Sequence, residues 1–156
     1  MYRILLPLIV VIIAISSCTK NVENSCPMVT VTAPDSQVAV LQHYIDSAGI
    51  TAVKDPRGFF YAIDDSGVST RPTPCSRITI SYKGTLLNGN TFDSNHDITM
   101  LMSGLINGWQ EGLPLIKKGG RIRLYLPPYL AYGASSTAAI PANSSLIFNI
   151  ELLDVK

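Results

Sequence analysis

The chain has 156 residues, a formal net charge of +1 and 15% charged residues. This length allows one domain and little else. A near-neutral chain without a run of basic residues lacks the electrostatic footprint of a nucleic-acid-binding protein, so no nucleic-acid partner is predicted.

The first seventeen residues have the pattern of an export signal rather than of a folded domain. A short positive start, Met1 to Arg3, precedes an almost wholly apolar run over residues 4–15. Because such a run is too short to span a bilayer comfortably, it favours a signal peptide over residues 1–17. Removal of residues 1–17 takes away the charge of Arg3, so the net charge falls from +1 to 0.

Residues 15–18, Ile-Ser-Ser-Cys, resemble the lipobox of bacterial lipoproteins. The resemblance implies cleavage before Cys18, lipidation of that cysteine and attachment of the mature chain to a membrane. Ordinary secretion is the alternative. Thr19 follows where some bacteria place an aspartate that retains lipoproteins at the inner membrane. The expected location is therefore the bacterial cell envelope, at the outer membrane.

Residues 18–34 are polar and lack helical periodicity, which predicts a tether between the lipid and the fold. A helix is predicted over residues 35–49, with Asp35 and Ser36 able to cap its start and Gly49 ending it. Apolar residues recur there at helical spacing, at Val38, Leu41, Ile45 and Ala48. The remaining residues, 50–156, are predicted to form the main domain.

Cys26 and Cys75 are the cysteines that remain after the lipidated one. Neither belongs to a Cys-x-x-Cys motif and neither has an adjacent histidine, so no metal site is predicted. In an oxidising compartment such a pair is more often a disulfide than a metal site. We expect a Cys26–Cys75 bridge, with two reduced, partly buried thiols as the alternative.

Four segments of the main domain have the pattern of strands. Residues 59–63 form an apolar run between turn sequences. Residues 78–83, 121–126 and 146–153 alternate with period two, which indicates one buried and one wetter face for each strand. A short helix is predicted over residues 107–113. This order predicts an α+β fold, with a twisted, largely antiparallel sheet wrapped around one short helix and an extra N-terminal helix.

Aromatic and apolar residues, one acid and no obvious nucleophile occur at positions that these elements could bring together. A pocket of this kind suits a reaction that forms no covalent bond, such as rotation about a prolyl peptide bond. Taken one at a time, the same residues are also ordinary core or turn residues. The set comprises Tyr82, Phe92, Asp93, Leu105, Ile106, Trp109, Tyr132, Ile140 and Phe148.

A series of motifs, in order from about residue 76 to residue 155, resembles the FKBP-type peptidyl-prolyl isomerase family. The motifs are Ile-Ser-Tyr-Lys-Gly-Thr-Leu (80–86), Gly-x-x-Phe-Asp-Ser (89–94), Gly-Trp-Gln-Glu-Gly-Leu (108–113), Tyr-x-Ala-Tyr-Gly (129–133), Ile-Pro-Ala-Asn (140–143) and Leu-Ile-Phe-Asn-Ile-Glu-Leu-Leu (146–153). The resemblance implies an isomerase without a cofactor, with proline-containing polypeptides as substrates and macrolides as inhibitors.

The resemblance also implies a role for each site residue. Trp109 is expected to form the floor of the pocket, and the backbone N–H of Ile106 and the hydroxyl of Tyr132 are expected to donate to substrate carbonyls. Asp93 is expected to shape the electrostatic field beside the twisting bond, without transferring a proton. The expected walls are Tyr82, Phe92, Leu105, Ile106, Ile140 and Phe148.

Two segments depart from the family pattern. Residues 92–109 are fewer than in compact eukaryotic members, and the basic residue and second aromatic of that stretch have no clear counterparts. The loop 134–139 is small and rich in Ser, Ala and Thr. The predicted function is an exported isomerase that assists protein folding, and a proline-binding chaperone module with low activity is the alternative.

Overall fold

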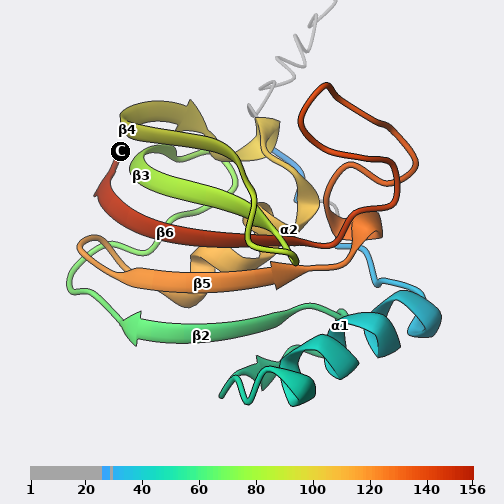
Figure 1. The fold of residues 1–156 in the computed structure, drawn as a ribbon. Coiled ribbons are helices and arrows are strands. Elements are labelled where there is room, and N and C mark those ends of the chain that lie inside the picture. Colours follow the sequence, from blue (N-terminus) through green and yellow to red (C-terminus); the bar gives the residue numbers. More distant parts are fainter. Residues whose placement is uncertain (1–25, 29) are drawn as a thin grey trace, which may run out of the picture.

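The structure is a computed structural model that describes residues 26–28 and 30–156 (Figure 1). The predicted signal peptide, Cys18 and the first part of the predicted tether lie outside the described residues. No helix within the described part of the chain is both long and apolar enough to cross a membrane.

A single six-stranded sheet organises the domain, and all of its neighbouring strands are antiparallel. Its spatial order is β1-β2-β5-β6-β3-β4, so the last strand of the chain lies at the centre. The strands are β1 (Val53–Lys54), β2 (Phe60–Asp65), β3 (Arg77–Leu86), β4 (Thr91–Leu101), β5 (Arg121–Leu126) and β6 (Leu146–Val155).

Within residues 26–28 and 30–156, two α-helices accompany the sheet, which confirms the predicted α+β class (Figure 1). The short helix α2 (Asn107–Gly112) lies against one face of the sheet, and α1 (Asp35–Ser47) lies on the β2 side. Three 3₁₀ turns connect the elements: η1 (Met102–Gly104), η2 (Leu113–Leu115) and η3 (Pro128–Leu130).

Helix α2 lies close to β5 because two of its residues have no side chain. A Cβ atom on Gly108 would lie 2.5 Å from a side-chain carbon of Leu126, and one on Gly112 would lie 2.6 Å from Leu124. Larger residues would therefore force the helix away from the sheet. The close approach fixes the position of Trp109, which lies between these glycines and is 4% exposed.

The prediction of a side-chain cap for α1 was wrong. Pro34 occupies the cap position and no side chain bonds there. The carbonyl of Pro34 accepts the N–H groups of Gln37 and Val38, and Asp35 is already in the first helical turn. The predicted end of the helix is correct, because Gly49 has a φ of +62°, a left-handed conformation that suits glycine.

Strand β4 was not predicted because its side chains do not alternate. It is an edge strand in which most residues are exposed, and its pairing with β3 shifts register twice, between Ile80 and Tyr82 and between Gly84 and Thr85. Each shift exchanges the faces to which the following side chains point. A strand with two such shifts has no period-two pattern to detect.

The last residues of the predicted tether contact the domain. Cys26 forms a disulfide with Cys75, with a Cα–Cα distance of 5.2 Å. Further along, the N–H of Val31 donates to a carboxylate oxygen of Glu111 at 2.9 Å, and Ala33 is 4% exposed. The N-terminal segment is thus bound to α2 and to the core.

Glu111 carries a buried carboxyl group. Its side chain is fully buried, and one oxygen has no hydrogen-bond partner within the described residues. The nearest cation is Arg57, with its Nε at 3.8 Å, but Arg57 already donates two hydrogen bonds to Asp55. Burial raises the pKa of Glu111 above the ordinary 4.5, although the Val31 N–H and Arg57 lower it.

We predict that Glu111→Gln raises the free energy of unfolding near neutral pH. A carboxyl with a raised pKa in the folded state contributes stability that is complete below the unfolded pKa and is lost as pH rises through the folded pKa. Glutamine keeps an oxygen to accept the Val31 N–H and carries no charge. The gain over the wild type should grow as pH rises above 4.5, the ordinary value, in urea unfolding curves.

The exposed Glu151 supplies the control, since Glu151→Gln should leave this pH dependence unchanged. A Glu111→Gln protein less stable than the wild type at every pH would contradict the prediction.

Candidate active site

A cavity of about 280 Å³ lies between the sheet, helix α2 and the loop after η3. Strand β3 contributes Tyr82, β4 contributes Asp93 and β6 contributes Phe148. Seven of the nine predicted site residues line this cavity. The full lining is Tyr82, Asp93, Met100, Gly104, Leu105, Ile106, Trp109, Tyr132 and Phe148.

The floor and walls are aromatic rings in edge-to-face contact. The Trp109 ring lies 5.1 Å from that of Tyr82 at 79° and 5.0 Å from that of Phe148 at 85°. Such pairs are favourable beyond the area they bury, and each ring restrains the next. The cavity therefore has a rigid apolar interior before any ligand enters.

Asp93 lies exposed at the mouth of the cavity and is oriented by Tyr82. The Tyr82 hydroxyl donates to Asp93 Oδ2 at 2.6 Å, a short distance typical of a charge-assisted bond. Burial and this hydrogen bond raise the pKa of Tyr82 to about 12. The hydroxyl thus stays protonated near neutral pH and holds one carboxylate oxygen in place.

Several hydrogen-bond donors at the cavity have no acceptor within the part of the chain that is described, the buried Nε1 of Trp109 among them. The backbone N–H of Ile106, the cap residue of α2, is one of them. The Tyr132 hydroxyl is another, on a residue that is 42% exposed. Burial, followed by the charge of Asp93, raises the pKa of Tyr132, so its proton is also retained. Both groups are available to carbonyl oxygens of a bound peptide.

Phe92 and Ile140 do not line the cavity. The Phe92 ring lies behind the wall, 5.5 Å from the Phe148 ring and against the backbone of Gly84. Ile140 is a core residue, 6% exposed. Phe92 thus supports the wall from outside the cavity.

Met100 and Gly104 line the cavity but were not predicted. The partly buried Met100 stands in the cavity wall. An apolar residue two positions after Ile98 was the available signal. Gly104 gave none, since a glycine that contributes only backbone to a cavity wall looks like any turn glycine.

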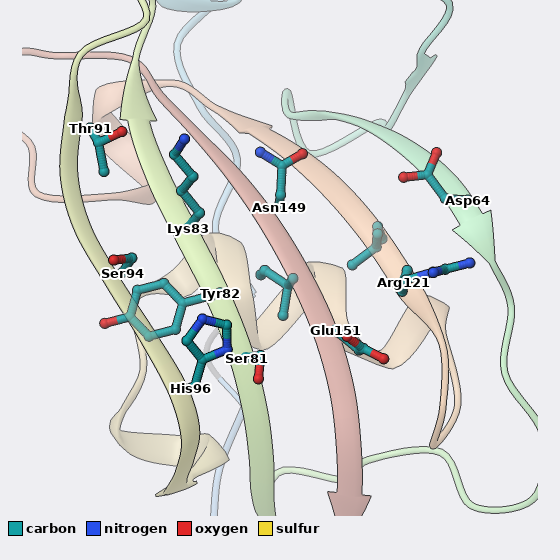
Figure 2. A pocket seen from close by; sticks show the side chains of 12 residues that line it. Asp64, Ser81, Tyr82, Lys83, Thr91, Ser94, His96, Arg121, Asn149 and Glu151 are labelled. Atoms are coloured by element: carbon teal, nitrogen blue, oxygen red, sulfur yellow. The ribbon is translucent and has the colours of Figure 1, made fainter.

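A larger cavity, of about 630 Å³, lies on the outer face of the sheet (Figure 2). Lys83, Asn149 and Glu151 stand there on β3 and β6, on the face opposite to Phe148. The lining mixes both signs of charge with hydroxyl and amide groups, the rings of Tyr82 and His96, and two isoleucines. It lacks the packed set of aromatic rings that forms the floor of the smaller cavity, so the smaller cavity is the candidate active site.

A family model described as FKBP-type peptidyl-prolyl cis-trans isomerase matches residues 68–153, which is more than half of the chain. The chain belongs to this family. The match extends over β3 to β6 and includes every residue that lines the candidate site.

Individual relatives agree with the FKBP-type assignment. The chain is 49% identical over 108 residues to the FKBP-type peptidyl-prolyl cis-trans isomerase FkpA of Buchnera aphidicola subsp. Schizaphis graminum, an alignment that covers 66% of this chain and 43% of that protein. It is 43% identical over 103 residues to FkpA of Escherichia coli strain K12, covering 64% of this chain and 38% of the relative. The chain thus spans about two fifths of the length of these curated relatives.

The crystal structure of FkpA from Escherichia coli has the same fold. The TM-score is 0.71 at 36% sequence identity, and the superposition covers 78% of this chain and 60% of that chain. The FKBP-type fold is therefore shared in three dimensions as well as in sequence.

Proposed function

We propose that this protein is a peptidyl-prolyl cis-trans isomerase that assists the folding of exported proteins. The observation that carries the proposal is the aromatic cavity in which Tyr82 orients one carboxylate, while the Ile106 N–H and the Tyr132 hydroxyl lack acceptors within the described residues. Membership of the FKBP-type family supports the same activity.

The chemistry needs neither a nucleophile nor a metal. Resonance in the prolyl amide gives a rotation barrier of about 18–20 kcal/mol, and the twisted amide at the top of that barrier has lost this resonance. A catalyst must bind the twisted form more tightly than the planar forms. A rigid apolar cavity with fixed dipoles can do this without reorganising during the reaction.

Each group has a role in this scheme. The proline ring rests on Trp109, and the Ile106 N–H and the Tyr132 hydroxyl hold the peptide through its carbonyl groups. Asp93 lies beside the carbonyl of the twisting bond and favours its altered polarity. The same apolar floor would accept a macrolide inhibitor.

A proline-isomerisation assay on a short peptide, coupled to a protease that cleaves only the trans form, tests the proposal. The wild type should accelerate exchange. Asp93→Ala should lower kcat/KM about tenfold, the effect of losing about 1.4 kcal/mol of transition-state stabilisation. Asp97→Ala, which changes another exposed aspartate of β4, is the matched control. Wild-type activity no greater than that of buffer alone, or an equal change in kcat/KM for both substitutions, would contradict the proposal.

A binding module with slow turnover is the second candidate. Met100 favours it, because a flexible thioether in the wall restrains a bound peptide less than a rigid ring would. Suppression of aggregation that survives Asp93→Ala, together with negligible isomerase activity, would select this function.

We also propose that the mature chain is attached to a bacterial outer membrane through lipidated Cys18. The lipobox-like sequence 15–18 supports this. Metabolic labelling with a radioactive fatty acid should mark the wild-type protein but not Cys18→Ser. Equal labelling of the two proteins, or no labelling of either, would refute lipidation at this residue.

A further inference from the structure

The peptide unit between Leu105 and Ile106 is held on its carbonyl side by Gln110. The side-chain amide of Gln110 donates to the Leu105 carbonyl at 2.7 Å and lies 3.4 Å from the Ser103 carbonyl. Gln110 is 8% exposed, so its amide has little access to water. A buried amide with these partners restrains the loop before α2.

The N–H of Ile106 belongs to that same peptide unit. In a trans peptide the C=O and N–H groups lie in one plane and point in opposite directions. A hydrogen bond that fixes the Leu105 oxygen on one side therefore also fixes the direction of the Ile106 N–H on the other. Gln110 is behind the unit, and the cavity is in front of it.

Backbone hydrogen bonds on either side of this peptide unit restrict its movement further. The Ile106 carbonyl accepts the N–H groups of Trp109 at 2.9 Å and Gln110 at 3.1 Å, which anchors the following peptide unit to α2. The Leu105 N–H donates to the Met102 carbonyl at 3.1 Å. Rotation of the Leu105–Ile106 unit alone would break the Gln110 bond, so this bond is the one that sets its orientation.

We propose that Gln110 is a positioning residue that aims the Ile106 N–H into the active site. The proposal rests on the proposed function, in which that N–H binds a substrate carbonyl. Gln110 does not line the cavity and acts only through the shared peptide unit. Its bond to Leu105 also polarises the amide, which makes the N–H a stronger donor.

Two substitutions remove the donor while keeping the length of the side chain. Gln110→Met has no hydrogen-bonding amide, and Gln110→Glu presents an ionised carboxylate to the Leu105 carbonyl near neutral pH. Each should lower kcat/KM about fivefold to tenfold, the equivalent of one lost hydrogen bond. Gln42→Glu makes the same chemical change at an exposed amide of α1 and should leave kcat/KM within twofold.

The Gln110→Glu protein allows a rescue that loss of structure would not produce. Burial should raise the pKa of the introduced carboxyl, and once protonated it can again donate to the Leu105 oxygen. In a protease-free NMR exchange assay, its activity relative to the wild type should therefore rise as pH falls. Gln110→Met should show no such rise. A flat ratio for Gln110→Glu, in a protein with wild-type near-ultraviolet circular dichroism, would overturn the proposal.

The NMR resonance of the Ile106 amide provides a second test that does not depend on activity. In ¹H–¹⁵N spectra of the free protein, it should shift and broaden in Gln110→Met, because its peptide unit is no longer anchored, and stay unchanged in Gln42→Glu. An unchanged Ile106 resonance in Gln110→Met would refute the positioning role. A wild type without isomerase activity whose Ile106 resonance still responds as expected would refute the proposed function alone.

Discussion

Replacing Trp109 with alanine is expected to lower kcat/KM by about 30-fold or more, since a buried aromatic anchor contributes about 2 kcal/mol or more and each 1.4 kcal/mol is tenfold. The substitution removes the floor of the cavity and the edge-to-face contacts with Tyr82 and Phe148. It also opens a cavity beneath the sheet, which should cost about 3–5 kcal/mol of stability. Isomerase kinetics and urea unfolding would measure the two effects.

Phe59→Ala separates loss of the site from loss of stability. Phe59 is fully buried but does not line the candidate site, so its removal should cost a similar free energy of unfolding. At a temperature where both variants are folded, the Phe59 variant should keep kcat/KM near that of the wild type. Equal losses of kcat/KM in the two variants would mean that Trp109 acts only through stability.

The double substitution Cys26→Ser and Cys75→Ser is expected to lower the free energy of unfolding by about 4 kcal/mol on the chain-entropy estimate for the separation of 49 residues. The bridge closes a long loop and so restricts the unfolded chain more than the folded one. The reduced wild type should show the same loss in denaturant curves, and kcat/KM of the folded protein should be unchanged because neither cysteine lines the site.

A loss below about 1 kcal/mol would contradict this expectation and would indicate that the unfolded chain already keeps residues 26 and 75 close together. If reduction destabilises the wild type but not the double-serine protein, the whole loss in the free energy of unfolding comes from the disulfide.

Local patterns were enough to predict most of the fold. Strands β3, β5 and β6 were predicted because their buried and exposed residues alternate. Helix α2 was predicted because Pro114, a residue that stops helices, follows the segment 107–113. Strand β4 lacks alternation because it is an exposed edge with two register shifts. Pattern thus identified the strands with one buried face and missed the two exposed strands, β4 and the two-residue β1.

The residue types of the candidate site were predictable from the sequence, but the residues that hold the site in place from outside were not. Motif order located Trp109 and Asp93, whereas the separation of wall from support depended on side-chain direction, as for Phe92 and Ile140. The contact between Val31 and Glu111 joins residues 80 positions apart, and no local pattern encodes it. The support from Gln110 was also not predictable from the sequence, because its partner is a backbone oxygen, and a sequence does not distinguish one backbone oxygen from another.

The Cys26–Cys75 bridge also sets how the domain would bear a mechanical load. Cys75 lies two residues before β3, a strand paired on both sides within the sheet. The shortest covalent path for tension applied before residue 26 therefore runs through the sulfur atoms directly into β3. Residues 27–74, which include α1, β1 and β2, lie outside that path and would carry no tension. A pull on the N-terminal end would reach the most strongly bonded part of the sheet and leave the weaker N-terminal elements unstretched.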